Sequence, residues 1–260
     1  MGMSEVRQAG ASQRSDIRGQ KSQVNVRIIR NDLLIFAAFA LLLAFVLLTR
    51  AVLWQWTPLA EWDRVFSERL HEHGRTSPGL VRYFHAFTFL ASTRMLFFEA
   101  TLVALVLAVR RHWRLALVWM ISLCSGYLLV HIMKAVVARP RPVFPDPFEW
   151  PTNASFPSGH TAGAALVFGL LAYLLARYWP NRRWTSYWVC GLFILAIAFS
   201  RLYLGAHWFS DVLGGIVFAL AWNLIAIAVM ERIPSAEATS ALSPARIPAA
   251  APSPSPARTS

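Results

Sequence analysis

Six long apolar stretches, separated by polar and charged segments, dominate the pattern of this sequence. Each is close to the length of about 20 residues that an α-helix needs to cross a bilayer. Arg94, Glu99 and His131 interrupt the second and third stretches. The pattern therefore predicts an all-α fold, a polytopic membrane helical bundle of about six transmembrane helices. The predicted spans are residues 33–56, 87–109, 115–137, 160–179, 184–203 and 211–230.

The composition supports this interpretation. Of the 260 residues, 56% are hydrophobic and only 15% are charged, and the mean hydropathy is +0.45. A water-soluble protein can bury an apolar helix in its core, but so many long apolar stretches are typical of a membrane protein. We expect one domain over residues 31–232, between a basic disordered tail at 1–30 and an Ala/Pro/Ser-rich disordered tail at 233–260.

The net charge of +12 and the isoelectric point near 10.9 would also fit a nucleic-acid-binding protein. The positions of the arginines indicate a different cause. If the chain crosses the membrane six times, arginines before the first span, after the last span and in two connections all lie on one side. This is the positive-inside pattern, so we expect both termini in the cytoplasm and no nucleic acid as a partner. The connections at 57–86, 138–159 and 204–210 then face the exterior.

Between the first two spans, Leu59, Trp62, Phe66 and Leu70 recur at helical spacing among charged residues. This periodicity predicts a short amphipathic helix in the membrane interface. Such a helix either caps the bundle or shapes a lateral entrance for a lipid.

Ionisable residues inside a membrane span are costly unless they have partners. Glu99 and His131 are in this position. We expect them to pair with each other or with Arg94 inside the bundle.

The first of three polar strings begins at Lys134, one of only two lysines in the chain, at the end of the third apolar stretch. A lone lysine there could simply anchor the helix by extending its amine to the interface. Arg139 and Arg141 follow, separated by Pro140 and closed by Pro142, and these prolines prevent the helix from continuing. Guanidinium groups on such a stiff turn suit bidentate contact with phosphate oxygens.

The second string, Pro157-Ser158-Gly159-His160, stands directly before the fourth apolar stretch. Proline and serine mark a helix start, and glycine lets the backbone approach a ligand closely. Free N–H groups and the positive end of the helix dipole make a site for an anion there. An ordinary capped helix would explain Pro157 and Ser158, but it would not explain the histidine in the first turn.

The third string is Ser200-Arg201 followed by His207 and Asp211. The last two are four positions apart where the sixth span begins, so we expect them to share a helix face. If Asp211 accepts a hydrogen bond from one ring nitrogen of His207, the other nitrogen is left as a nucleophile. A structural His–Asp pair is the alternative, which is plausible for this string alone and poor for all three strings together.

Taken together, the three strings resemble the signature of the type 2 phosphatidic acid phosphatase (PAP2) superfamily, which also contains vanadium haloperoxidases and glucose-6-phosphatase. That signature is a lysine, six residues and Arg-Pro; then Pro-Ser-Gly-His; then Ser-Arg, five residues, His, three residues and Asp. The chain matches every specified position, and the resemblance covers about residues 55–230.

The resemblance implies a lipid phosphatase with the PAP2/haloperoxidase-like helical core. His207 would attack phosphorus and form a phosphohistidine, Asp211 would orient it, and His160 would protonate the leaving group and then activate water. The groups that would hold the phosphate oxygens are Lys134, Arg141, Ser158, Gly159 and Arg201. No metal and no cofactor are implied, because fixed cations would neutralise the charge of the transition state. Arg139 lies outside the signature and is expected only to face lipid headgroups.

The substrate implied is a membrane lipid phosphate bound from the bilayer: undecaprenyl pyrophosphate, phosphatidic acid, phosphatidylglycerol phosphate or a lipid A phosphate. The expected location is a bacterial inner membrane with the site at its periplasmic or outer face, and no obligate protein partner is expected. A lipid phosphotransferase would use the same phosphohistidine, so the sequence leaves this alternative open. A non-catalytic lipid-binding or transport protein is an alternative of a different class, although the repeated halves and broken helices of many transporters are not evident. A haloperoxidase is disfavoured, because those relatives are soluble.

Overall fold

The computed structural model describes residues 3–150 and 152–233, and the side chains among them from residue 28 onward. All regular elements in these ranges are helical, which confirms the predicted all-α fold. The elements are α1 (Met3–Leu53), α2 (Thr57–Arg75), α3 (Pro78–Thr88), η1 (Phe89–Ala91), α4 (Thr93–Val109), α5 (Trp113–Val137), α6 (Gly159–Tyr178), η2 (Pro180–Arg182), α7 (Arg183–Tyr203) and α8 (Phe209–Met230).

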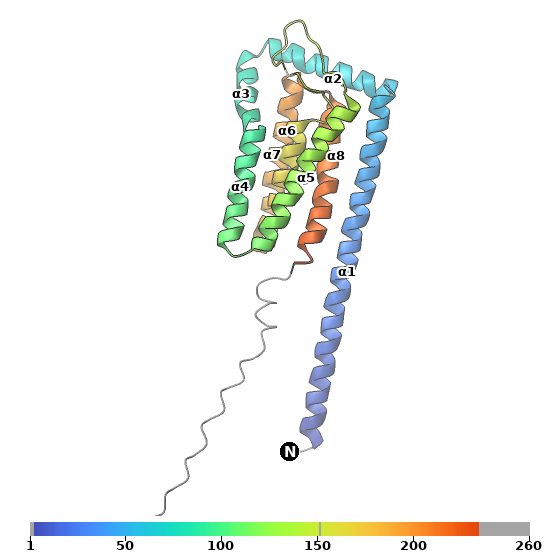
Figure 1. The fold of residues 1–260 in the computed structure, drawn as a ribbon, viewed down its shortest axis with the longest axis vertical. Helices are drawn as coiled ribbons and strands as arrows, with labels where there is room; N and C mark the ends of the chain where they lie inside the picture. Colours follow the sequence, from blue (N-terminus) through green and yellow to red (C-terminus); the bar gives the residue numbers. More distant parts are fainter. Residues whose placement is uncertain (1–2, 151, 234–260) are drawn as a thin grey trace, which may run out of the picture.

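The long helices run side by side as a bundle, and α2 lies across one end of it (Figure 1). α6 is the central helix, since it packs against α4, α5, α7 and α8, while α1 packs against α8. Its sequence explains this position, because the small residues Gly163, Ala164 and Ala165 let neighbouring helices approach closely. The largest hydrophobic core lies around α6 and includes Trp119 of α5 and Leu170, both fully buried.

Gly215 of α8 lies against the start of α6. A Cβ atom at this position would be 3.0 Å from the carbonyl oxygen of Ser158 and 3.2 Å from the amide nitrogen of Ala162. Because both are backbone atoms, they cannot rotate aside, and we expect Gly215→Ala to lower the free energy of unfolding by about 1–3 kcal/mol. Gly191→Ala is the matched control, since nothing lies within 4 Å of a Cβ atom there and alanine favours a helix. Thermal unfolding in detergent measures both variants, and a wild-type melting temperature for Gly215→Ala would contradict this prediction.

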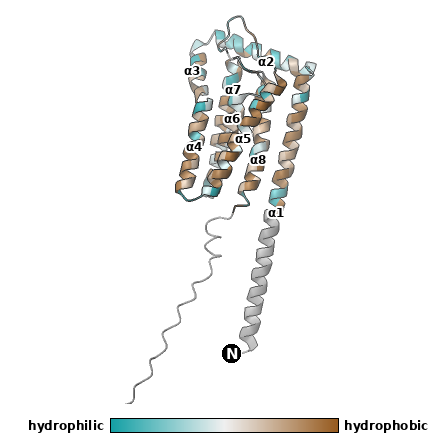
Figure 2. Cartoon of the chain, in the orientation of Figure 1, coloured by the Kyte–Doolittle hydropathy of each residue, from teal (hydrophilic) through white to brown (hydrophobic). Residues whose placement is uncertain are grey.

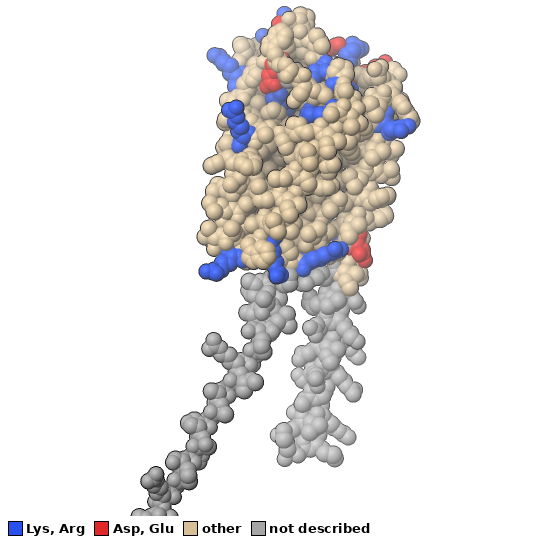
Figure 3. All heavy atoms as spheres, in the orientation of Figure 1, with Lys and Arg blue, Asp and Glu red and all other residues tan. Residues whose placement is uncertain are grey.

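The bundle has the dimensions and surface of a membrane protein. Five helices are long and apolar enough to cross a membrane, and α3 to α4 form a sixth candidate with a 44° bend. Apolar residues cover the length of the bundle (Figure 2), and most charged side chains gather at its two ends (Figure 3). Large apolar side chains such as Phe36, Val109 and Val136 are exposed on the outer surface, as expected where the surrounding solvent is lipid. The prediction of about six transmembrane helices is confirmed.

The N-terminal segment differs from its prediction. α1 extends back to Met3, through the basic segment at 1–30 for which disorder was predicted. The predicted C-terminal tail lies, beyond Ile233, outside the described residues, so the division into one domain and two tails stays a prediction.

The predicted helix between the first two spans is present as α2, and its fully buried positions are polar or glycine. Its buried residues are Asp63, Ser67, His71 and Gly74, whereas Trp62 is exposed. Leu59, Phe66 and Leu70 pack against the hydrophobic clusters of the bundle, so the face of α2 that lies on the bundle carries both apolar and polar residues. The contacts of the polar residues belong to the site described below.

The expected pairing inside the bundle is wrong. Among the described residues, Glu99 contacts neither His131 nor Arg94 through a hydrogen bond or ion pair, and its buried Oε2 atom has no partner. His131 instead lies edge-on to the ring of Tyr127.

Candidate active site

The three polar strings of the sequence meet at the end of the bundle that α2 crosses (Figure 1). Lys134 lies in the last turn of α5, and the chain then runs through an irregular segment to the start of α6. Arg201 lies in the last turn of α7, and His207 lies in the short connection to α8. Because α5 and α7 end where α6 and α8 begin, residues far apart in the sequence lie together.

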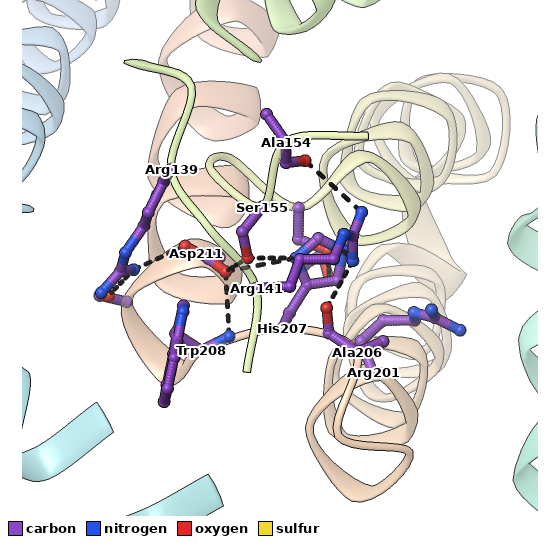
Figure 4. A network of polar contacts seen from close by, with 12 residues as sticks. Arg139, Arg141, Ala154, Ser155, Arg201, Ala206, His207, Trp208 and Asp211 are labelled. Carbon is purple, nitrogen blue, oxygen red and sulfur yellow. Dashed lines mark hydrogen bonds and ion pairs between the residues drawn. The ribbon is translucent and has the colours of Figure 1, made fainter. Parts of the chain in front are cut away.

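His207 and Asp211 form the centre of this cluster (Figure 4). The Oδ2 atom of Asp211 lies 3.3 Å from Nδ1 of His207, and it also accepts a hydrogen bond of 2.9 Å from the amide of Trp208. The second bond caps α8, which begins at Phe209. The predicted contact is therefore present, but His207 precedes the helix, so the two residues do not share a helix face.

The other ring nitrogen of His207, Nε2, lies 3.1 Å from Nη1 of Arg141. Arginine can only donate, so Nε2 is the acceptor in this contact, and Nδ1 carries the ring proton toward Asp211. Burial lowers the pKa of His207 to about 3, although the hydrogen bond and the charge of Asp211 act in the opposite direction. At neutral pH the imidazole is therefore uncharged, with its free electron pair at Nε2.

Arg139 binds the carboxylate that faces His207. Its Nη1 atom lies 2.6 Å from Oδ1 of Asp211, and its Nη2 atom lies 2.7 Å from Oδ2 of Asp63 on α2. Only 15% of the Arg139 side chain is exposed. The expectation that Arg139 only faces lipid headgroups is therefore wrong. The hydroxyl of Ser155 donates to the remaining oxygen of Asp211, Oδ2.

Lys134 and Arg141 are hydrogen-bonded to neutral oxygens of the irregular segment. Nζ of Lys134 donates to the carbonyl oxygens of Ala154, at 2.6 Å, and Ser155, at 3.3 Å. Arg141 donates to the carbonyl oxygen of Asn153 at 2.8 Å and to its side-chain oxygen at 2.5 Å. Neither cation has a carboxylate partner within the described part of the chain. The oxygens of an anion can displace such neutral acceptors, because charge-assisted hydrogen bonds are stronger.

Arg201 has a carboxylate partner, Glu149 of the irregular segment. Nη1 of Arg201 lies 2.8 Å from one oxygen of Glu149, and Nη2 pairs with the other. Burial raises the pKa of Glu149, but the hydrogen bonds and charge of Arg201 outweigh it and hold this pKa below its ordinary value. Burial, followed by repulsion from Arg201, lowers the pKa of Arg141. Arg141 and Arg201 therefore lie close to each other and to the carboxylate of Glu149.

The start of α6 supplies backbone donors to the same place. Ser158 is fully buried, and its amide donates to the carbonyl oxygen of Asp211 at 3.0 Å. The next three amides, those of Gly159, His160 and Thr161, donate to no oxygen of the described residues. They lie at the positive end of the helix dipole, where anions bind. The half-buried side chain of His160 lies in this first turn.

Gly159, at the start of α6, lies next to Lys134 of the first string. A Cβ atom on Gly159 would lie 3.6 Å from Cε of Lys134. The structure therefore brings together all eight residues that the sequence singled out for this site.

Within residues 3–150 and 152–233, no group of three or more His, Cys, Asp or Glu side chains is arranged to hold a metal ion. The Nε2 side of His207 faces the cation Arg141, and Arg201 is close enough to act on the charge of the ring. Cations in this position are suited to an anion such as phosphate.

Sequence reasoning missed four residues of this cluster: Asp63, Arg139, Ser155 and Glu149. Their side-chain contacts join positions 52 to 147 residues apart, which no local motif shows. The outer connections contain acidic residues as well as arginines, which was a signal for such pairs. That signal does not say which arginine each carboxylate contacts.

Comparison with known proteins points to one superfamily. Residues 113–234 match the family model described as PAP2 superfamily. The chain is 33% identical over 114 residues to phosphatidylglycerophosphatase B of Bacillus subtilis, which covers 43% of this chain and 55% of that protein. It is 32% identical over 118 residues to an undecaprenyl-diphosphatase of Sulfolobus acidocaldarius, covering 43% and 53% of the two chains. The chain thus spans about half the length of the curated relatives it matches.

A solved structure shows the same fold over a longer range. The crystal structure of a transmembrane PAP2 type phosphatidylglycerolphosphate phosphatase from Bacillus subtilis matches with a TM-score of 0.71 at 25% sequence identity. The match covers 76% of this chain and 98% of that one. The resemblance predicted from the three strings and the transmembrane bundle are both confirmed.

Proposed function

We propose that this chain, a PAP2-superfamily protein over residues 113–234, is an integral membrane phosphatase that hydrolyses a phosphomonoester or diphosphate of a membrane lipid. One observation carries the proposal. The neutral imidazole of His207 is held by Asp211 at Nδ1, while its free Nε2 faces the cationic groups around Arg141. This arrangement suits a phosphate whose phosphorus is attacked by Nε2 while its oxygens replace the neutral acceptors of the cations.

In the first step, Nε2 of His207 attacks phosphorus in line with the bond to the leaving group. The N–P bond forms, the P–O bond to the lipid breaks, and His160 gives its proton to the departing oxygen. The ring of His207 gains positive charge, which the carboxylate of Asp211 stabilises through Nδ1–H. The phosphate oxygens are held by Lys134, Arg141, Arg201 and the amides at the start of α6.

In the second step, a water molecule attacks the phosphorus of the phosphohistidine. His160, now neutral, accepts a proton from this water, the N–P bond breaks, and inorganic phosphate leaves. His207 returns to its neutral state with Nδ1 protonated, and His160 is again the acid.

The position of the site at one end of the bundle supports a lipid substrate. Trp54, Trp56 and Trp62 are exposed in and beside α2 at this end, and tryptophans are enriched at membrane–water interfaces. A lipid would place its phosphate at this level while its tail stays in the surrounding bilayer. The names of the relatives make phosphatidylglycerol phosphate and undecaprenyl pyrophosphate the first substrates to test, before phosphatidic acid and lipid A phosphates.

The proposed location is a bacterial inner membrane, with both termini in the cytoplasm and the site at the outer face. The support is a basic group at the end of the bundle opposite the site: Arg110 and Arg111 lie between α4 and α5, and Arg114 lies in the first turn of α5. Labelling of single cysteines introduced at each end, in intact cells, tests this orientation.

Phosphate release by the detergent-purified protein, with a chelator present, tests the proposed activity. We expect release from at least one of the four lipids. Transfer of labelled phosphate to a lipid acceptor without release would identify a phosphotransferase instead. Lipid binding with neither release nor transfer would contradict catalysis.

The pH dependence should show no loss of activity near 6.5, the ordinary pKa of histidine. Because the pKa of His207 is lowered to about 3, its Nε2 stays unprotonated as the pH falls from 7 toward 5. We therefore expect kcat/KM for a lipid diphosphate to lack an acid limb with a midpoint near that ordinary value. A fall in kcat/KM with a midpoint near 6.5 would contradict this prediction, provided that protonation of the substrate does not account for it. The stability of the fold, in contrast, should depend on pH in this range. As the pH falls from about 6.5 toward 3, His207 takes up a proton in the unfolded chain but not in the folded one, so the free energy of unfolding decreases.

A further inference from the structure

We propose that Asp63 of α2 is a positioning residue for phosphate transfer: through Arg139 and Ser210 it fixes the orientation of Asp211 and thereby of His207. This inference deepens the proposed function and rests on it. Asp63 belongs to none of the three sequence strings, and its contact with Ser210 joins positions 147 residues apart.

The carboxylate of Asp63 is buried, with 1% of the residue exposed. Its Oδ1 atom accepts a hydrogen bond of 2.8 Å from the amide of Ser210. Its Oδ2 atom accepts bonds of 2.5 Å from the hydroxyl of Ser210 and 2.7 Å from Nη2 of Arg139. A buried carboxylate destabilises the fold unless its oxygens are partnered. Here each partner either binds Asp211 or precedes it in the chain.

Arg139 connects the two carboxylates. Its Nη1 atom donates to Oδ1 of Asp211 at 2.6 Å and to the hydroxyl of Ser210 at 2.7 Å, while Nη2 binds Asp63. A guanidinium group is planar and rigid, so it holds two carboxylates at a set distance and angle. With Oδ1 of Asp211 bound in this way, Oδ2 is the oxygen that faces His207 (Figure 4).

The shared guanidinium of Arg139 also determines how much negative charge Asp211 presents to His207. One positive group serves two carboxylates, so Asp211 keeps negative charge with which to stabilise the cationic ring that forms when His207 is phosphorylated. If Asp63 loses its charge, Arg139 interacts with Asp211 alone and neutralises more of that charge. Both effects act on the chemical step, whereas the phosphate oxygens are bound by other groups.

Asp63→Asn in the full chain, purified in detergent, tests this role. Glu61→Gln is the matched control, because it removes the same charge from an exposed position of α2. We expect kcat of Asp63→Asn to fall about 10–100-fold. This is the range seen in metal sites when a group that orients a ligand through a hydrogen bond is removed. The inhibition constant of inorganic phosphate should stay at its wild-type value. Arg139→Lys keeps the charge but loses the planar guanidinium group, so it should also lower kcat and leave the inhibition constant of phosphate unchanged. This variant replaces Asp63→Asn in the test if Asp63→Asn does not fold.

The outcomes separate this role from the proposed function. If wild type and Glu61→Gln release phosphate while folded Asp63→Asn keeps the wild-type kcat, the positioning role is contradicted and the proposed function stands. If kcat falls together with phosphate affinity, the role is also contradicted, because a purely structural anchor of α2 would lower both. If wild type releases no phosphate from any lipid, the proposed function itself fails, and the positioning role fails with it.

Discussion

Replacing His207 by alanine is expected to lower the rate of phosphate release by about 10⁴-fold or more, as for other enzymes that lose their nucleophile. Nε2 of His207 carries the free electron pair in the cluster, and its neighbour Arg141 can only donate. The carboxylate of Asp211 cannot substitute, because Arg139 and Ser155 already bind its oxygens. The cations remain in the variant, so we expect it to bind a lipid phosphate nearly as well as wild type does. Initial rates with a detergent-solubilised lipid phosphate measure the difference.

His112→Ala is the control for this variant. His112 precedes α5 at the opposite end of the bundle from Lys134, so it cannot contact a phosphate held near His207. We expect the control to keep the wild-type rate. A loss of less than tenfold in folded His207→Ala would mean that another group attacks phosphorus.

Asp211→Asn is expected to lower kcat by about 10³–10⁴-fold, comparable with the loss of the aspartate in Ser-His-Asp hydrolases. The carboxylate accepts from His207, Trp208, Arg139 and Ser155. An amide has one acceptor oxygen, so its NH2 group would face donors, and the ring of His207 would lose both its orientation and the charge that stabilises the phosphohistidine. Inorganic phosphate should bind with little change, because the cations proposed to hold it are other residues.

Asp32→Asn provides the same change of charge at an exposed position in α1, far from the site. We expect it to keep the wild-type kcat. The melting temperature of Asp211→Asn must be measured beside its rate, because a buried amide facing Arg139 also destabilises the fold. A folded Asp211→Asn with kcat within tenfold of wild type would contradict the assigned role.

Most of the fold could be predicted because its determinants are local. Each span is a continuous apolar stretch of the length that a bilayer requires, so six of them appear without any knowledge of their neighbours. The bend between α3 and α4 was not predicted, since it depends on a helix start at Ser92, whose hydroxyl accepts from the amide of Met95. The helical start of α1 at Met3 was also missed, because the segment's polar composition is typical of disordered chains.

The cluster that forms the candidate site could be predicted where its residues follow one another at fixed spacing. Lys134, Arg141 and the dyad of His207 and Asp211 were all found in this way, and the structure brings them together. The partners of Asp211 could not be found, because they come from α2 and from the irregular segment before α6. Arg139 is the clearest case: its neighbours in sequence suggest a surface residue, whereas its two carboxylate partners are 72 and 76 positions away.

The helix α2 shows what periodicity could and could not predict. The recurring apolar residues predicted a helix here, and Leu59, Phe66 and Leu70 pack on the bundle. The same helix also buries Asp63 and His71, which bind Arg139 and Asp146. Hydrophobic periodicity says nothing about such polar partners, because they lie far away in the sequence.

The measurement that tests the central claim most directly is capture of the phosphoenzyme. Lipid phosphate labelled in its terminal phosphate is mixed with the protein, the reaction is stopped with alkali, and labelled peptides are identified. The phosphohistidine mechanism predicts an acid-labile, base-stable label on His207, which is absent from His207→Ala and chased to inorganic phosphate in wild type. Label on another residue, or phosphate release that continues in His207→Ala, would contradict it.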